Sequence, residues 1–149
     1  MIKKILAALD GSKSADRALD FALDLARKYS AEVVLISVFD APSVSLVAPG
    51  IVFAPTSIAK YLAELRAFHE MVLSEALKKA KKLKAGLKVS KKLLQGRAAD
   101  KIVETAKEGG FDLIVIGSRG LGGIKGFFLG SISDRVADEA PCPVLIVKE

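Results

Sequence analysis

The sequence predicts an α/β fold in which a parallel β-sheet lies between two layers of helices. Five short apolar runs alternate with segments of helical periodicity along the 149 residues, and this alternation builds a parallel sheet from βαβ units. A glycine-rich segment, residues 117–131, joins the fourth apolar run to the last helical segment. A chain of this length most simply forms one domain, and we assign residues 1–149 to it.

Strands and helices are expected to alternate along the whole chain. The predicted elements are a strand over 2–9, a helix ending at 29, a strand over 32–39, a helix over 58–84, a strand over 87–94, a helix between 96 and 110, a strand over 112–116, a helix from 131 that ends before 141, and a strand over 144–147. The continuous apolar run at 32–39 is typical of a strand covered on both faces. Lysines within 87–94 favour an edge strand.

Capping signals predict where several helices begin and end. Either Ser12 or Ser14 can cap the first helix. Gly86 is the expected C-cap of the long helix, because glycine tolerates the left-handed conformation found there. Ser131 is the expected N-cap of the last helix, with Asp134 in a variant of the capping box.

The middle of the chain holds the only histidine and a long connection. His69 lies on the apolar stripe of the helix over 58–84. No second histidine or cysteine has ligand spacing to it, so we expect a partly buried structural residue rather than a metal ligand. Residues 40–57 combine prolines with apolar residues, which suits either a ligand lid or a dimer contact.

The glycine-rich segment has the chemistry of an anion site. Glycine lets a backbone approach a ligand closely, and the N–H groups at the start of the following helix attract negative oxygens. The spacing matches neither G-x-x-x-x-G-K-[ST] nor G-x-G-x-x-G. It is G-x2-G-x9-G-S, at Gly117, Gly120, Gly130 and Ser131. Tight turns alone are the alternative use of these glycines.

This spacing resembles the ATP-binding signature of the universal stress protein family. Residues 131–136 and 140–147 resemble that family's closing helix and strand, and the resemblance covers nearly the whole chain. It implies a three-layer αβα, Rossmann-like fold of the adenine nucleotide alpha hydrolase type, with five parallel strands in the order 3-2-1-4-5. Strands one and four then meet where the strand order reverses, which is where such sheets bind ligands. It also implies that the backbone of Val38 meets the adenine edge and that Ala8 lines the same pocket.

The last part of the glycine-rich segment is expected to bind phosphate. Backbone N–H groups around Gly130, Ser131 and Ile132, together with the Ser131 hydroxyl, are placed to hold phosphate oxygens. Arg119 either adds positive charge to this site or is solvated.

The start of the segment is expected to pass close to the sugar. Gly117 and Gly120 leave room for the ribose and the α-phosphate. Asp10 either accepts hydrogen bonds from the ribose hydroxyls, binds Mg²⁺, or only forms the Asp-Gly turn. The candidate nucleotide-binding residues are Ala8, Asp10, Val38, Gly117, Arg119, Gly120, Gly130, Ser131 and Ile132.

We expect a regulatory, stress-response protein that binds ATP, ADP or AMP, with Mg²⁺ or Mn²⁺ accompanying the nucleotide. Phosphoryl transfer requires metal clamps, a positioned nucleophile and charge stabilisation, and the sequence offers one carboxylate, one arginine and one serine. We therefore assign no catalytic residue. A slow ATPase or phosphotransferase using the same pocket, and a nucleotide-independent structural dimer, are the alternatives.

Composition bears on location and on nucleic-acid binding. The net charge of +6 arises largely from lysines between 78 and 92, which we interpret as a solvated basic face rather than a polyanion site. No apolar run is long enough to cross a membrane or to form a signal-peptide core. The single cysteine, Cys142, cannot form an internal disulfide. We therefore expect a cytoplasmic protein without membrane or nucleic-acid partners.

The last strand suggests self-association. Residues 144–147 are wholly apolar, and an apolar strand at a sheet edge invites pairing. The family resemblance implies that this strand pairs with its twin across a two-fold axis. We expect a homodimer centred on Val144, Leu145, Ile146 and Val147; the sequence does not indicate a downstream protein partner or a physiological trigger.

Overall fold

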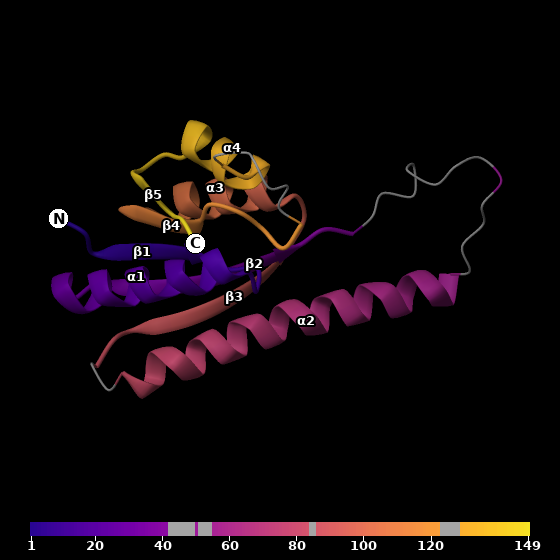
Figure 1. Ribbon diagram of the computed structural model, residues 1–149, viewed down its shortest axis with the longest axis horizontal. Helices are drawn as coiled ribbons and strands as arrows, with labels where there is room; N and C mark the ends of the chain where they lie inside the picture. The colour runs from indigo at the N-terminus through magenta and orange to yellow at the C-terminus, as the bar shows by residue number, and fades with distance from the viewer. Residues whose placement is uncertain (42–49, 51–54, 84–85, 123–128) are drawn as a thin grey trace.

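The computed structural model of the protein describes residues 1–41, 50, 55–83, 86–122 and 129–149. The elements are β1 (Lys4–Ala8), α1 (Lys13–Tyr29), β2 (Glu32–Phe39), α2 (Pro55–Lys82), β3 (Val89–Gln95), α3 (Ala98–Gly109), β4 (Leu113–Gly117), α4 (Ser131–Glu139) and β5 (Val144–Val147). Figure 1 shows their arrangement. Every predicted strand and helix is present, with ends that differ by a few residues.

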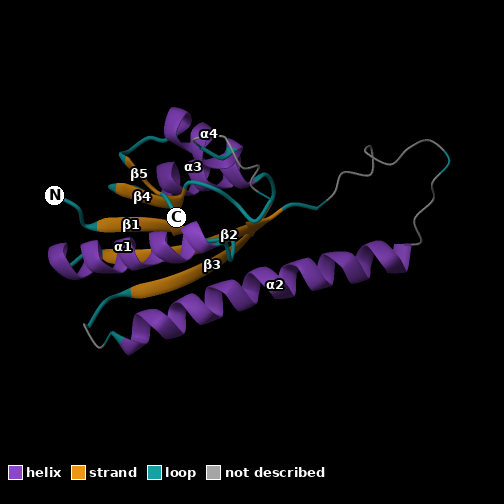
Figure 2. Cartoon of the chain, in the orientation of Figure 1, coloured by secondary structure: helices purple, strands orange, loops and turns teal. Residues whose placement is uncertain are grey.

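The five strands form one parallel sheet in the order β3-β2-β1-β4-β5. Helices α1 and α2 cover one face of this sheet, and α3 and α4 cover the other (Figure 1, Figure 2). The predicted fold class and strand order are therefore confirmed. Because β1 continues toward β2 and β4 continues toward β5, the strand order reverses between the neighbours β1 and β4.

Each face of the sheet has its own apolar core, because successive strand side chains point to opposite faces. On β1, Ile5 and Ala7 belong to the core beneath α1 and α2. Leu6 and Ala8 belong to the core beneath α3 and α4. We call these the α1/α2 core and the α3/α4 core. Burial on both faces explains why the central strands are continuous apolar runs in the sequence.

The edge strands differ in character. In β3, the predicted edge strand, half-buried and exposed residues largely alternate. At the opposite edge, Val144, Leu145 and Ile146 of β5 are half-buried and Val147 is buried. The position of β5 agrees with the expectation from the sequence, and its pairing with a second copy stays a prediction.

The long helix begins at Pro55 rather than at the predicted Ile58. Proline is also a turn signal, which is why the sequence favours a later start. At the first helical position, however, its missing N–H costs nothing. Residues 42–49 and 51–54 lie outside the described residues, so the lid and the dimer contact both stay predictions. Within the described ranges, no helix has the length and apolarity needed to cross a membrane.

The capping predictions for α1 and α2 have different outcomes. Ser12 caps α1, since its side chain accepts a hydrogen bond from the Ala15 N–H at 3.2 Å. The prediction for α2 is wrong: the helix ends at Lys82, four residues before Gly86. Gly86 does adopt the left-handed conformation, with φ of +63°, but it does so beyond the helix.

His69 is a buried structural residue, 8% exposed. Its ring lies against the rings of Phe39 and Phe68, with centroid distances of 6.1 and 5.4 Å. Ser37 Oγ lies 2.6 Å from His69 Nδ1 and donates to the Leu9 carbonyl at 2.6 Å. Because Ser37 gives its single hydrogen to Leu9, the Nδ1 of His69 carries the proton of this pair.

The stability of the protein is expected to fall in mild acid because of His69. Burial lowers the pKa of this imidazole, and the Asp10 carboxylate opposes the shift. The unfolded chain therefore binds a proton near pH ~6.5 that the folded chain binds only at lower pH. The free energy of unfolding is then highest above pH ~6.5 and decreases as the pH falls toward the folded pKa.

His69→Gln is the matched variant, because glutamine retains a donor for Ser37 and does not titrate. Urea unfolding at about pH 7.5 and about pH 5.5 should show a smaller decrease in the free energy of unfolding for this variant than for the wild type. An equal decrease in both proteins would contradict the role of His69.

Candidate functional site

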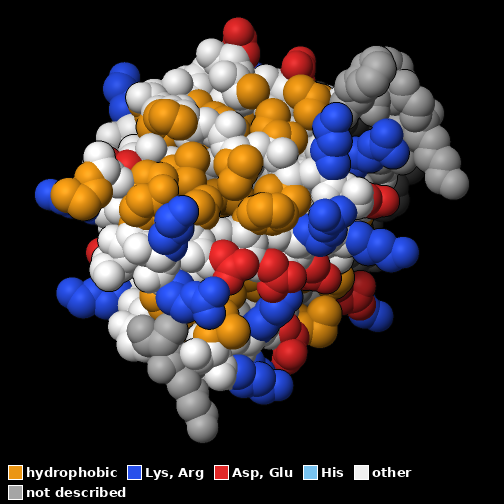
Figure 3. All heavy atoms as spheres, turned by 60° about the vertical axis from the view of Figure 1, so that its left-hand side comes forward, with side chains coloured by type: hydrophobic (Ala, Val, Ile, Leu, Met, Phe, Trp, Pro, Cys, Tyr) orange, Lys and Arg blue, Asp and Glu red, His pale blue; other side chains and the backbone are white. Residues whose placement is uncertain are grey.

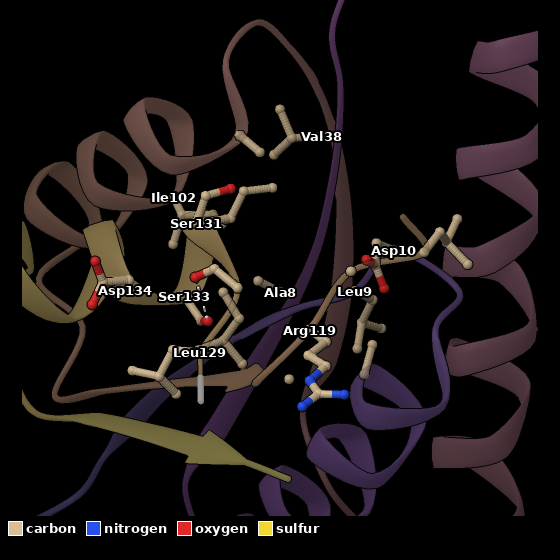
Figure 4. A pocket seen from close by; sticks show the side chains of 18 of the residues that line it. Ala8, Leu9, Asp10, Val38, Ile102, Arg119, Leu129, Ser131, Ser133 and Asp134 are labelled. Carbon is tan, nitrogen blue, oxygen red and sulfur yellow. Dashed lines mark hydrogen bonds between the residues drawn. The ribbon is translucent and has the colours of Figure 1, made fainter. Parts of the chain in front are cut away.

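A pocket of about 850 Å³ opens beyond the carboxyl ends of β1, β2 and β4, at the reversal of strand order. Its volume is within the range of small-molecule sites. Figure 4 shows side chains from several elements pointing into it. All nine residues predicted from the sequence line it: Ala8, Asp10, Val38, Gly117, Arg119, Gly120, Gly130, Ser131 and Ile132. Their contact with a nucleotide stays a prediction.

Asp10 directs its two carboxylate oxygens to different places. Oδ1 accepts a hydrogen bond from the Ser12 N–H at 2.9 Å, which stabilises the turn between β1 and α1. Oδ2 lies 3.0 Å from the position that a Cβ would take at Gly120, and so lies against the start of the glycine-rich segment. Asp10 therefore stabilises the Asp-Gly turn, one of the roles that the sequence suggests, and it uses only one of its two carboxylate oxygens to do so.

The turn after Asp10 also packs against α2. Gly11 has φ of +85°, a conformation that favours glycine, and a Cβ there would lie 3.1 Å from side-chain atoms of Phe68 and Val72. The backbone that carries Asp10 is thus held by α1 through Ser12 and by α2 through these two apolar residues.

Gly117 is required for a reason that the sequence does not reveal. A Cβ at this position would lie 2.5 Å from Ser14 Oγ and 2.8 Å from the Ala15 backbone nitrogen. The missing side chain therefore makes room for the first turn of α1, whereas the sequence suggests room for the ribose. At Gly120, by contrast, a Cβ would extend toward Asp10 Oδ2 at the pocket itself.

The two ends of the glycine-rich segment are tied together at the start of α4. The Gly130 N–H donates to the Ser118 carbonyl at 2.6 Å. Ser133 Oγ lies 3.0 Å from both the Ser118 and the Gly130 carbonyl oxygens, and donates to them. Ser133 was not among the predicted site residues; its place in the first turn of a helix that follows a glycine loop is the signal that could have indicated it.

The predicted N-cap of the last helix is wrong. The N-cap of α4 is Gly130, which has no side chain to offer, and Ser131 is the first helical residue. The Asp134 N–H donates to the Gly130 carbonyl at 2.9 Å as an ordinary helical bond, so no capping box forms with Ser131. Without a capping side chain, the first N–H groups of α4 retain the capacity to bind an anion.

One wall of the pocket is apolar. Val38 at the end of β2 and Ile102 of α3 lie near each other there (Figure 4), and Ala98 of the same helix and Ala8 of β1 also line the pocket. The two α3 residues are absent from the site residues predicted from the sequence. The signal that could have found them is the four-residue spacing of Ala98 and Ile102, which places both on one face of the helix.

Arg119 supplies the one cationic side chain among the described residues that line the pocket. Its carbonyl oxygen accepts hydrogen bonds from Ser14 Oγ at 2.7 Å and from Ser12 Oγ at 3.2 Å. The start of the glycine-rich segment is therefore fastened to the start of α1. Figure 4 shows the Arg119 side chain on the same side of the pocket as Asp10, with Ser131 and Asp134 opposite.

The pocket offers few protein ligands for a metal ion. Over the part of the chain that the structure describes, no three histidine, cysteine or acidic side chains are grouped to hold a metal. Asp10 Oδ2 can contribute a single oxygen. A divalent cation at this place would therefore need most of its oxygen ligands from a bound ligand and from water.

A three-layer α/β sandwich with this strand order and a pocket at the reversal defines a Rossmann-like fold. A family model described as the universal stress protein family matches residues 1–148. The chain belongs to the universal stress protein family.

Individual relatives agree with this assignment. The universal stress protein YxiE of Bacillus subtilis is 37% identical over 99% of this chain and 100% of its own length. The universal stress protein MJ0531 of Methanocaldococcus jannaschii is 38% identical over 100% of this chain and 84% of its own length. A universal stress protein solved in complex with cAMP is 29% identical, covers 98% of this chain and 97% of its own, and has a TM-score of 0.71.

Proposed function

We propose that this protein binds ATP, or ADP or AMP, in the pocket at the reversal of strand order, and acts as a nucleotide-dependent regulatory protein. One observation carries the proposal: residues from β1, β2, β4 and the start of α4, which has no capping side chain, converge on one pocket of about 850 Å³ with an apolar wall. The related universal stress protein solved with cAMP supports an adenine nucleotide as the ligand class.

The apolar wall suits the base. Val38, Ala98 and Ile102 offer apolar surface for a flat aromatic ring. Adenine buried there would still require hydrogen-bond partners for its polar edge, because an unpaired buried polar group is costly. The backbone of Val38 at the end of β2 is the proposed partner.

The start of α4 suits phosphate. The first N–H groups of α4, at Ser131 and Ile132, follow an N-cap without a capping side chain, and the helix dipole adds to their attraction for an anion. The Ser131 hydroxyl supplies a further donor, and the Arg119 guanidinium supplies positive charge from the other side of the pocket (Figure 4).

A divalent cation, Mg²⁺ or Mn²⁺, is proposed to accompany the nucleotide. The Asp10 carboxylate would otherwise repel the phosphates, and a cation between them removes that repulsion. The cation would bind Asp10 Oδ2 and phosphate oxygens, a mixture typical of Mg²⁺ sites.

We propose regulation rather than turnover, and a cytoplasmic location. The polar side chains among the described lining residues are those of Asp10, Arg119, Ser131, Ser133 and Asp134. We interpret them as a binding set rather than as the metal clamps and positioned nucleophile that phosphoryl transfer requires. The alternative is a slow ATPase or phosphotransferase in the same pocket. Steady phosphate release that is lost in Asp10→Asn would favour that alternative.

The direct test uses freshly purified protein in two steps. Denaturing it and identifying any released small molecule by mass spectrometry shows whether an adenine nucleotide is carried from the cell. Titration calorimetry with ATP and Mg²⁺, after removal of any bound ligand, then measures the affinity. A protein that releases no nucleotide and shows no binding at millimolar ATP would contradict the proposed function.

We also propose that β5 pairs with β5 of a second copy. Ile114 N–H donates to the Pro143 carbonyl and Ser118 N–H donates to the Val147 carbonyl. With a period of two along the strand, the backbone groups of Val144 and Ile146 then face away from the sheet. Figure 3 shows one face of the molecule, on which apolar side chains gather. Val144, Leu145 and Ile146 of β5 are only half-buried, and exposed apolar area favours protein contact.

Ile146→Pro is the variant that tests this pairing, because proline removes an outward N–H and is tolerated at sheet edges. We expect light scattering to give twice the monomer mass of 15.8 kDa for the wild type and the monomer mass for Ile146→Pro. A monomeric wild type at micromolar concentration would contradict the dimer.

A further inference from the structure

We propose that the buried hydroxyl of Ser14 is a positioning group that holds the backbone of Arg119, and thereby sets how strongly the pocket prefers a phosphorylated nucleotide over the bare nucleoside. The inference deepens the proposed nucleotide-binding function and rests on it. Ser14 does not line the pocket; it acts through residues that do.

One side chain engages both backbone groups of Arg119. Ser14 lies in the first turn of α1 and is 0% exposed. Its Oγ donates to the Arg119 carbonyl oxygen at 2.7 Å, and the Arg119 N–H donates to the same Oγ at 3.4 Å. A hydroxyl has one hydrogen and two acceptor sites, so both bonds can exist together.

These bonds determine the orientation of the neighbouring peptide unit. In a planar trans peptide, the Arg119 carbonyl and the Gly120 N–H point in opposite directions. Because the carbonyl points at Ser14, the Gly120 N–H points away from α1. Both Arg119 and Gly120 line the pocket, so the Ser14 hydroxyl decides how this peptide unit is presented to a ligand.

The surroundings of Ser14 hold its side chain in place. A Cβ at Gly117 would lie only 2.5 Å from Ser14 Oγ, so the end of β4 packs directly on the hydroxyl. Ser12 Oγ also donates to the Arg119 carbonyl at 3.2 Å, but the same hydroxyl caps α1 by accepting the Ala15 N–H. Ser14 is therefore the residue whose hydroxyl can be removed without removing the N-cap.

The preceding residue is held from the other side of the sheet. The Ser118 carbonyl accepts from Ser133 Oγ and from the Gly130 N–H, both at the start of α4. Two buried serines, Ser14 and Ser133, thus fasten the start of the glycine-rich segment to two helices on opposite faces of the sheet. Such preorganisation lowers the cost of arranging N–H donors around an anion.

The test compares ATP with adenosine, which shares the base and ribose and lacks the phosphates. In Ser14→Ala, calorimetry with Mg²⁺ present should show ATP affinity reduced about tenfold, the effect of losing one or two hydrogen bonds, and adenosine affinity within about twofold of the wild type. Amide hydrogen exchange around Arg119 should be faster in the variant without ligand, because the Ser14 bond to its N–H is lost.

Thr105→Val is the control. Thr105 Oγ1 donates to the Lys101 carbonyl at 2.6 Å within α3, and neither residue lines the pocket, so this variant loses a hydroxyl hydrogen bond away from the ligand. Its ratio of ATP affinity to adenosine affinity should equal that of the wild type. If Ser14 were merely structural, Ser14→Ala would weaken both ligands equally or lower only the melting temperature.

The outcomes separate the two proposals. A wild-type protein that binds neither ATP nor adenosine overturns the proposed function. A wild type that binds ATP, together with an unchanged ATP-to-adenosine ratio in Ser14→Ala, overturns only the role of Ser14. A ratio that falls about tenfold in Ser14→Ala, and not in Thr105→Val, supports it.

Discussion

Replacing Gly130 with valine is expected to weaken ATP binding about a hundredfold or more while the fold stays intact. Gly130 has φ of −72° and ψ of 157°, which valine adopts without strain. A Cβ there would lie 3.1 Å from the Ser118 carbonyl oxygen, so this carbonyl must shift to admit the side chain, and the contact between the two ends of the glycine-rich segment is disturbed. Losing two charge-assisted hydrogen bonds at the start of α4 costs about 3 kcal/mol or more, which corresponds to a hundredfold.

Ala137→Val provides the control for Gly130→Val. Ala137 is an exposed residue of the same helix, and the substitution also introduces a valine side chain on α4, outside the residues that line the pocket. Calorimetry should give wild-type ATP affinity for Ala137→Val, and circular dichroism should show unchanged helix content for both variants. Wild-type affinity in Gly130→Val would contradict the phosphate assignment.

The second large effect is expected for Asp10→Asn. Asparagine can still accept the Ser12 N–H that Asp10 Oδ1 accepts at 2.9 Å, so the turn after β1 should persist. The negative oxygen that faces Gly120 is lost, however. We expect ATP affinity measured with Mg²⁺ to fall tenfold or more, on the order of the 1.5–3 kcal/mol of a charged interaction.

The effect of Mg²⁺ on ATP affinity shows whether Asp10 binds a cation or only stabilises the turn after β1. In the wild type, adding Mg²⁺ should strengthen ATP binding. In Asp10→Asn this gain should shrink, and binding in the presence of EDTA should be no weaker than in the wild type, because the repulsion between carboxylate and phosphate is gone. Equal gains from Mg²⁺ in both proteins would restrict Asp10 to the turn.

The Asp10→Asn variant should also lower the pKa of His69 further, since the Asp10 carboxylate raises it.

Local patterns were sufficient to predict most of the fold. Buried strands such as β2 are continuous apolar runs, and α1 has small and apolar residues at helical spacing capped by Ser12, so each element is encoded within its own segment. The strand order was available only through the family resemblance, because pairing is set by contacts between distant segments. The start of α2 was misplaced because Pro55 suits both a turn and a helix N-terminus.

The sequence predicted which residues line the pocket better than it predicted the contacts among them. Motif spacing, strand ends and, for Ala8 and Val38, the family resemblance indicated residues that all line one pocket. The reasons for individual residues depend on partners far away in the chain: Gly117 makes room for Ser14, and Ser14 bonds to Arg119 across 105 positions. The N-cap of α4 was assigned to Ser131 because serine is the commoner cap, whereas the structure places Gly130 there.

The sheet divides the apolar interior into two cores, and this division affects how ligand preference can change during evolution. The pocket lining draws Ala8, Ile36, Ile102 and Ile116 from the α3/α4 core, and Leu9 and Ala15 from the α1/α2 core. Most described residues of the more populous α1/α2 core lie away from the pocket. Descendants of this chain could therefore acquire new ligand preferences by changing one compartment, while the other continues to supply much of the stability on which the chain depends to fold.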